Sequence, residues 1–139
     1  MRTSRGFALW KLVLAAIAVS APLIASAQLL QKDWTKTVRR DRETRLYTFS
    51  VFQNSGTFCT DYGIPGLTVT SPPQNGTARI AQTEATPKGC PNAIKANGVF
   101  YQPNPGFTGS DVFTVEATPQ GRVEADSSAK TNIFHVTVK

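Results

Sequence analysis

Residues 99–117, with the sequence VFYQPNPGFTGSDVFTVEA, constrain the fold of this chain more than any other segment. The first three residues are apolar or aromatic, as in a buried strand. Residues 103–106, Pro-Asn-Pro-Gly, indicate a turn, because proline lacks the backbone N–H that a central strand uses. Beyond Gly109, Phe113 and Val115 alternate with polar residues, which is the period of a strand with one buried face. The segment therefore predicts two strands joined by a turn-rich connection.

Short alternating segments between glycine and proline turns recur along the chain, and no window has a sustained helical period. Asn75-Gly76 is a strong hairpin signal. The strands 111–118 and 132–138 should pair as a hairpin. Further strands are expected over residues 46–52, 67–70 and 77–82, and a short early strand is expected around Thr37. Residues 53–66 are expected to form one long loop. Six or seven short strands separated by such turns favour an antiparallel β-sandwich.

Motif positions in the same segment resemble the closing strands of bacterial immunoglobulin-like and cadherin-like domains: Tyr101, Pro103, Phe107, Gly109, Asp111 and Phe113. The resemblance extends over residues 67–138 and includes the Pro73-x-x-Gly76-Thr77 step. It implies an all-β, antiparallel immunoglobulin-like β-sandwich of about seven strands. It implies no activity and no particular partner.

Asp111 stands where such domains enter a strand, and a short carboxylate there can accept backbone N–H groups of a turn. The alternative is calcium binding, which cadherin-like relatives achieve through carboxylate clusters between successive domains. This sequence has neither a second domain nor an Asp-x-Asp cluster. The turn role is therefore favoured, and no metal is expected.

Residues 1–27 look like a secretory signal peptide. The segment has a positive start and an uncharged apolar run over residues 12–25, and it ends in the small-residue pattern Ala25-Ser26-Ala27. The apolar run, of about 14 residues, is too short to cross a bilayer comfortably. An uncleaved membrane anchor is the alternative. We expect cleavage before Gln28 and a protein that no longer spans the membrane.

Cleavage defines the expected organisation of the mature chain: a short flexible lead over residues 28–34, then one sandwich domain over 35–139. The lost segment carries three positive charges, so the net charge falls from +6 to +3. The expected location is the periplasm or the extracellular medium.

Cys59 and Cys90 are the only cysteines, and an even number in an exported chain implies a disulfide. Closing a loop of this length contributes about 3 to 4 kcal/mol in the loop-entropy model. A redox pair is the alternative, but the C-x-x-C spacing of thiol oxidoreductases is absent. We therefore expect a structural link between two turn-rich loops.

Catalytic and metal chemistry have little support in this sequence. After residue 27 there is one histidine and no methionine, whereas transition-metal sites need several soft or borderline ligands. His135 alternates with apolar neighbours and should lie on the outer face of the last strand. No nucleophile turn accompanies it. Carboxylates could still meet in space, although their spacing does not predict it. The expectation is a protein without cofactor that is not an enzyme.

Two groups are candidate partner contacts. One is a basic run containing Arg39, Arg40, Arg42 and Arg45, which could face an anionic partner or merely keep a charged edge strand soluble. The other is the pair of aromatics near the first cysteine, namely Phe58 and Tyr62. Nucleic acid is not expected, since the run has no stacking aromatics.

These observations lead to a non-enzymatic, exported immunoglobulin-like module that binds an unknown protein or glycan of the cell envelope. The alternative is a small carbohydrate-binding domain that uses loop aromatics and a basic face. The expected contact surfaces are the loops around Cys59 and Cys90, the hairpin tip over 120–122, or an exposed edge strand. The sequence identifies neither the partner nor the oligomeric state.

Overall fold

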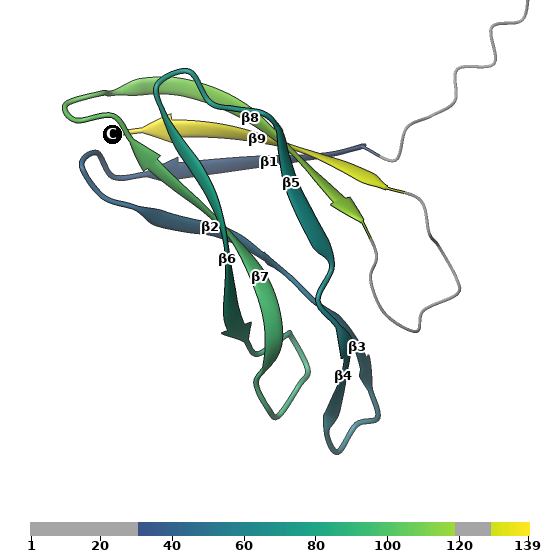
Figure 1. Cartoon of the computed structure of the whole chain (residues 1–139). Coiled ribbons are helices and arrows are strands. Elements are labelled where there is room, and N and C mark those ends of the chain that lie inside the picture. The colour runs from purple at the N-terminus through teal and green to yellow at the C-terminus, as the bar shows by residue number, and fades with distance from the viewer. Residues whose placement is uncertain (1–30, 119–128) are drawn as a thin grey trace, which may run out of the picture.

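The computed structural model describes residues 31–118 and 129–139. These residues form nine β-strands and no helix (Figure 1), so that part of the chain contains no helix that could cross a membrane. The strands are β1 (Gln31–Val38), β2 (Thr44–Phe49), β3 (Val51–Asn54), β4 (Cys59–Gly63), β5 (Gly66–Ser71), β6 (Gly76–Ala85), β7 (Ile94–Pro103), β8 (Gly109–Thr118) and β9 (Lys130–Val138). The predicted all-β class is confirmed, although the described residues hold nine strands where about seven were expected.

The strands form two main sheets and one small ribbon. The first sheet has the order β1-β9-β8-β5 and the second the order β2-β7-β6, while β3 and β4 pair as a separate ribbon. Every pairing is antiparallel except that of β1 with β9. The predicted hairpin of 111–118 with 132–138 is confirmed by the β8–β9 pairing, in which Phe113 lies opposite Phe134. The expected tip at 120–122 lies outside the described residues.

One hydrophobic core lies between the two main sheets. Alternation along β8 turns Phe113 and Val115 inward, and neither is exposed to solvent. The ring of Phe113 stacks 5.0 Å from that of Phe134 on β9 and 5.9 Å from that of Tyr101 on β7, measured between centroids. Because β7 belongs to the second sheet, this stack joins the two sheets. Burying each such ring stabilises the fold by roughly 2 to 3 kcal/mol.

β7 extends further than the sequence indicates, and this corrects the prediction for Pro103. The strand does not end at Tyr101 but continues to Pro103, which pairs with Gly76 of β6. Proline is compatible with this position, because the pairing of β7 with β2 ends at Tyr101 and Pro103 therefore lies at a sheet edge on that side. The turn begins one residue later, where the Phe107 N–H donates to the Asn104 carbonyl at 3.0 Å.

Two further expectations differ from the structure because edge strands show little apolar alternation. Residues 31–34 belong to β1 rather than to a flexible lead, and parallel pairing with β9 holds them. The expected loop over 53–66 contains β4 and the end of β3. Both segments are mostly polar and exposed, so their strand state depends on the strand with which they pair. Residues 28–30 and the signal segment 1–27 lie outside the described residues.

Candidate functional site

A groove of about 610 Å³ opens between the two main sheets, at the end where β1 and β9 begin and β2 leads into β3. We call it the aromatic groove, because four aromatic side chains line it: Trp34, Tyr47, Phe49 and Phe52. They come from β1, β2 and β3. The connection between β6 and β7 forms part of the wall. Ligand sites in proteins commonly have volumes of about 300 to 1,000 Å³.

Three of the four rings of the aromatic groove contact one another, and a partly buried hydrogen bond holds Trp34. Trp34 and Tyr47 have ring centroids 4.0 Å apart, and Phe49 meets Tyr47 edge-on at 4.8 Å. The indole Nε1 of Trp34 donates to Oδ1 of Asn132 at 3.0 Å, and Asn132 is only 4% exposed. The three rings are half-buried, while Phe52 keeps 37% of its surface exposed. A ligand would therefore meet pre-positioned apolar area.

The charges around the groove have one sign. Lys32, Lys88 and Lys130 line it, and no aspartate or glutamate is among its lining residues in the described part of the chain. The Nζ atom of Lys32 lies 4.2 Å from the ring centroid of Trp34, which is a cation–π contact. This setting favours a ligand that is neutral or anionic, because every charged residue among the lining residues is a lysine.

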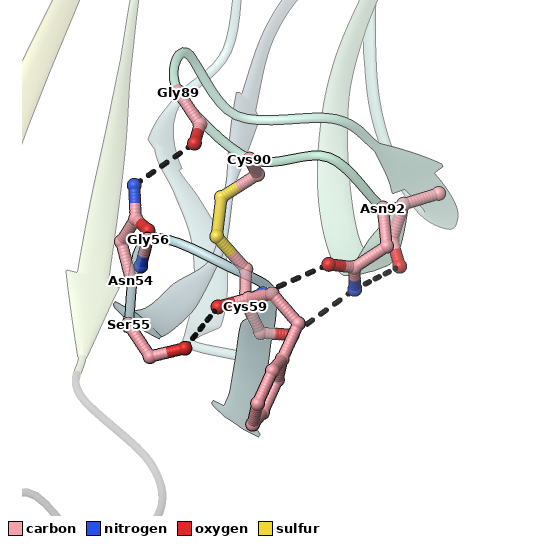
Figure 2. Close-up of a disulfide and its surroundings, with 9 residues drawn as sticks. Asn54, Ser55, Gly56, Cys59, Gly89, Cys90 and Asn92 are labelled. Atoms are coloured by element: carbon pink, nitrogen blue, oxygen red, sulfur yellow. Dashed lines mark hydrogen bonds between the residues drawn. A yellow bond between two sulfur atoms is a disulfide. The ribbon is translucent and has the colours of Figure 1, made fainter.

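The predicted disulfide is confirmed, and it fixes one wall of the aromatic groove (Figure 2). It joins Cys59, the first residue of β4, to Cys90 in the β6–β7 connection. Hydrogen bonds reinforce it: the Asn92 side chain accepts from the Cys59 N–H at 2.8 Å and donates to the Cys59 carbonyl at 3.0 Å. Asn54 Nδ2 donates to the Gly89 carbonyl at 2.9 Å. We call this set the clip.

The clip matters for the groove because it joins two wall segments that are distant in sequence. Phe52 lies on β3, which pairs with β4, and Lys88 lies two residues before Cys90. Both segments line the groove. Holding them together removes conformational freedom that a ligand would otherwise have to restrict on binding.

The two aromatics singled out from the sequence lie near the groove but outside its lining. Phe58 and Tyr62 are 55% and 36% exposed on the β3–β4 ribbon, and the Tyr62 hydroxyl donates to Gln53 Oε1 at 2.6 Å. Sequence reasoning missed Trp34 and Phe52, which do line the groove. A lone tryptophan in a polar, charged stretch was the available signal for Trp34.

The arginines of the basic run lie at the opposite end of the molecule, in and beside the turn between β1 and β2 (Figure 1). Arg40 Nε lies 3.9 Å from an oxygen of Asp41, and Arg45 donates to Thr83 Oγ1 at 3.3 Å. The structure therefore separates the two groups of candidate contacts, and a single surface cannot combine the loop aromatics with these arginines.

Asp111 anchors a turn at this same end. Its Oδ1 accepts from the Gln74 N–H at 3.0 Å, and its Oδ2 accepts from the Asn75 N–H and the Tyr101 hydroxyl, each at 2.9 Å. Asp111 is 5% exposed. Burial and then the hydrogen bond to Asp111 raise the pKa of Tyr101. The Val112 N–H also donates to Oδ1 of Asp111. With these donors, the carboxylate has the geometry expected of a turn-anchoring group.

The remaining motif positions surround this carboxylate. Pro103 and Phe113 are buried, Phe107 packs against the core, and Gly109 has a positive φ of 131°. A side chain at Gly109 would be strained, which explains the glycine. The motif thus lies in the framework of the fold and away from the aromatic groove.

His135 lies on the outer face of β9, and its Nε2 is 3.0 Å from Asp33 Oδ1. The hydrogen bond from this imidazole, followed by that from Gln31, lowers the pKa of Asp33. Within residues 31–118 and 129–139, no group of three or more His, Cys, Asp or Glu side chains could hold a metal ion.

Comparisons with known proteins add little. No protein-family model and no curated protein matches this sequence. The chain is similar to a solved chain described as "Structure of PbICP-C in complex with falcipain-2", with 11% sequence identity, a TM-score of 0.41, and coverage of 82% of this chain and 93% of that chain. At this score the likeness carries no argument about fold family, partner or function.

Proposed function

We propose that this protein is a non-enzymatic, exported immunoglobulin-like module that binds an envelope or extracellular macromolecule through the aromatic groove. One observation carries the proposal: four aromatic side chains line an open groove whose wall is held by the clip. The immunoglobulin-like assignment is supported by two face-packed sheets around one core and by the Tyr101–Phe113 motif. Export is supported by the signal-like segment 1–27 and by the disulfide.

The groove suits binding for two physical reasons. Aromatic side chains provide large contact area with few rotatable bonds, which is why they dominate the energetics of many interfaces. Trp34 is already held by Asn132, and Phe52 by the clipped ribbon, so little ordering remains to be done when a partner arrives.

Crosslinking in intact cells tests the site. A photoreactive residue at Lys88, in the groove, is compared with one at Lys95, an exposed lysine of β7 that does not line it. We expect the photoreactive residue at position 88 to capture a macromolecule that the one at position 95 does not capture. Equal capture from both positions would count against the groove as the contact surface.

The captured macromolecule is then titrated against two variants of the same ribbon. Phe52→Ala removes a ring from the groove, whereas Phe58→Ala removes an equally large, more exposed ring outside it. Loss of a central aromatic contact should weaken binding by about tenfold or more. Phe58→Ala should leave it within about twofold. The reverse order would assign the contact to the outer face of the ribbon.

A small carbohydrate-binding domain is the second candidate. It is favoured by the paired rings of Trp34 and Tyr47 beside the lysines of the groove, since sugar faces stack on aromatic rings and lysines suit acidic sugars. Trp34 is the only tryptophan after residue 27. Its fluorescence should therefore change on titration with saccharides selected from a glycan array. An array without signal, together with a captured protein, would decide against this candidate.

A further inference from the structure

A second hollow, of about 300 Å³, lies beside the turn between β1 and β2. We call it the arginine hollow, because Arg39, Arg42 and Arg45 line it together with Glu43 and Thr44. Three arginines and one glutamate thus line a single small concavity, and one of them, Arg45, also donates to Thr83 Oγ1 at 3.3 Å. The turn between β1 and β2 lies at the end of the molecule opposite the β3–β4 ribbon (Figure 1).

The one carboxylate of the hollow is already engaged by an arginine from another strand. Arg79 of β6 donates to both oxygens of Glu43, from Nη2 at 2.6 Å and from Nε at 3.0 Å. This paired geometry occupies both carboxylate oxygens. Arg39 and Arg42 form no ion pair or hydrogen bond through their side chains with any other residue of the described part of the chain. The positive charge of the hollow is therefore not neutralised from within.

The backbone that carries these arginines is anchored on both sides. Asp41, at a φ of 57°, accepts from the Gly106 N–H at 2.9 Å and so ties the turn to the β7–β8 connection. The Arg40 N–H donates to the Lys139 carbonyl at 2.9 Å, and the Lys139 N–H donates to the Val38 carbonyl at 3.0 Å. These bonds fix the backbone positions from which the arginine side chains extend.

We propose that the arginine hollow binds a tetrahedral oxyanion, a phosphate or sulfate group, through Arg39, Arg42 and Arg45. Guanidinium groups present planar pairs of N–H donors that match two oxygens of such an anion, and charge-assisted bonds of this kind are about twice as strong as neutral ones. The site is independent of the aromatic groove, with which it shares no lining residue.

Anion selectivity separates a built site from a merely charged surface. The mature chain, labelled with ¹⁵N, is titrated with sodium sulfate and with sodium phosphate while sodium chloride holds the ionic strength constant. We expect saturable shifts of the Arg39, Arg42 and Arg45 Nε–Hε resonances. Linear, unsaturated shifts, or equal shifts with chloride alone, would overturn the proposal, because screening acts on all exposed charges alike.

Three matched variants test the residues. Arg39→Gln and Arg42→Gln should each weaken the apparent affinity for sulfate by about tenfold, as expected for the loss of a charge-assisted contact. Arg40→Gln changes the net charge equally within the same turn but removes no lining residue, so it should leave the affinity within about twofold. Equal losses of sulfate affinity in all three variants would show that net charge, and not a specific site, accounts for the binding. Unchanged circular dichroism of each variant is the folding control.

Three probes then distinguish the source of the oxyanion. Heparin presents sulfate on a saccharide, vesicles of phosphatidylcholine with phosphatidylglycerol present phosphate on a lipid, and inorganic phosphate is the free ion. The source is the probe that binds the parent protein most tightly and whose affinity falls in the Arg39→Gln variant. If Arg40→Gln weakens the binding of heparin or vesicles as much as Arg39→Gln does, the proposed site is wrong. Phe52→Ala should change none of these affinities, so failure of the groove and failure of the hollow are separable.

Discussion

At the end of the molecule that holds Asp111, a buried carboxylate ties a turn to β7, whereas at the end that holds the disulfide the aromatic groove opens between the two main sheets. Strands β1 and β2, one from each main sheet, diverge from the turn that joins them toward this second end (Figure 1). We call the two ends the closed end and the open end. At the closed end β6 and β7 of the second sheet pack closely, since a side chain on Gly76 would come within 2.6 Å of the Tyr101 ring and of the Gln102 carbonyl oxygen. At the open end Trp34 and Phe49 remain only half-buried.

The two ends therefore use different means to hold the same two sheets. The closed end relies on a buried carboxylate that collects three donors from a turn and from β7. The open end cannot bury its aromatics fully without losing the groove, so the clip holds its wall covalently. We expect changes at the closed end to affect mainly stability, and changes at the open end to affect stability and binding together.

The largest effect is expected at the closed end, from Asp111→Ala. The substitution leaves the Tyr101 hydroxyl and the backbone N–H groups of Gln74 and Asn75 without their acceptor. Leaving one buried and two partly buried donors without this carboxylate should lower the free energy of unfolding by about 3 to 5 kcal/mol. Urea denaturation followed by circular dichroism measures it. A loss below about 1 kcal/mol would mean that this network does not hold the closed end.

At the open end, the double variant Cys59→Ala/Cys90→Ala should lower the free energy of unfolding by about 3 kcal/mol, chiefly by releasing the unfolded chain from a closed loop. The bonds from Asn54 and Asn92 should keep part of the ribbon in place. Denaturation with and without reductant measures the effect. If the partner of the groove binds the double variant as tightly as the parent, the clip has no role in shaping the site.

A smaller effect, with a pH signature, is expected from Tyr101→Phe. Near neutral pH the variant should lose about 1 to 2 kcal/mol, because Asp111 loses one donor. The pKa of Tyr101 is raised in the folded protein above its ordinary value of 10.0. Its contribution is therefore present below pH 10 and declines as the pH rises above that value. The parent should lose stability faster than the variant above pH 10, and parallel curves would contradict this.

The smallest effect is expected at the exposed pair of Asp33 and His135. The imidazole lowers the pKa of Asp33 below its ordinary value of 3.8, so any stabilisation is present above that pH and lost as the pH falls. An NMR titration of the Asp33 carboxyl group should show a midpoint below 3.8 in the parent. His135→Gln should move it upward. No upward shift would show that the pair does not form in solution.

Much of the fold followed from hydrophobic alternation. The inward face of β8, the β8–β9 hairpin and the disulfide were all predicted. The hairpin indicated by Asn75-Gly76 was wrong, because β5 and β6 on either side of that turn pair within different sheets. The predicted strand 46–52 is divided into β2 and the start of β3. Strand β4, the end of β3 and the start of β1 were not predicted, because they carry too few apolar residues for a period to be visible. Their strand state comes from pairing with a neighbour.

The candidate sites were harder to predict. The sequence indicated Phe58 and Tyr62, yet the rings that line the groove include Trp34 and Phe52, from strands that were predicted poorly or not at all. The basic run was visible in full. The bond that engages Glu43 was not visible, because its partner Arg79 is 36 positions away in sequence.

The arginine hollow is lined by one continuous segment, residues 39–45, and only the bond from Arg79 to Glu43 reaches it from elsewhere in the chain. By itself, the sequence determined the all-β class, the covalent link between Cys59 and Cys90, and the inward faces of β8 and β9, because hydrophobic period, turn residues and cysteine number act locally or admit one solution. Only the tertiary structure decided which residues line the aromatic groove. That groove arises where strands of both main sheets meet, and the distance and burial of side chains there depend on sheet packing, which no local pattern encodes.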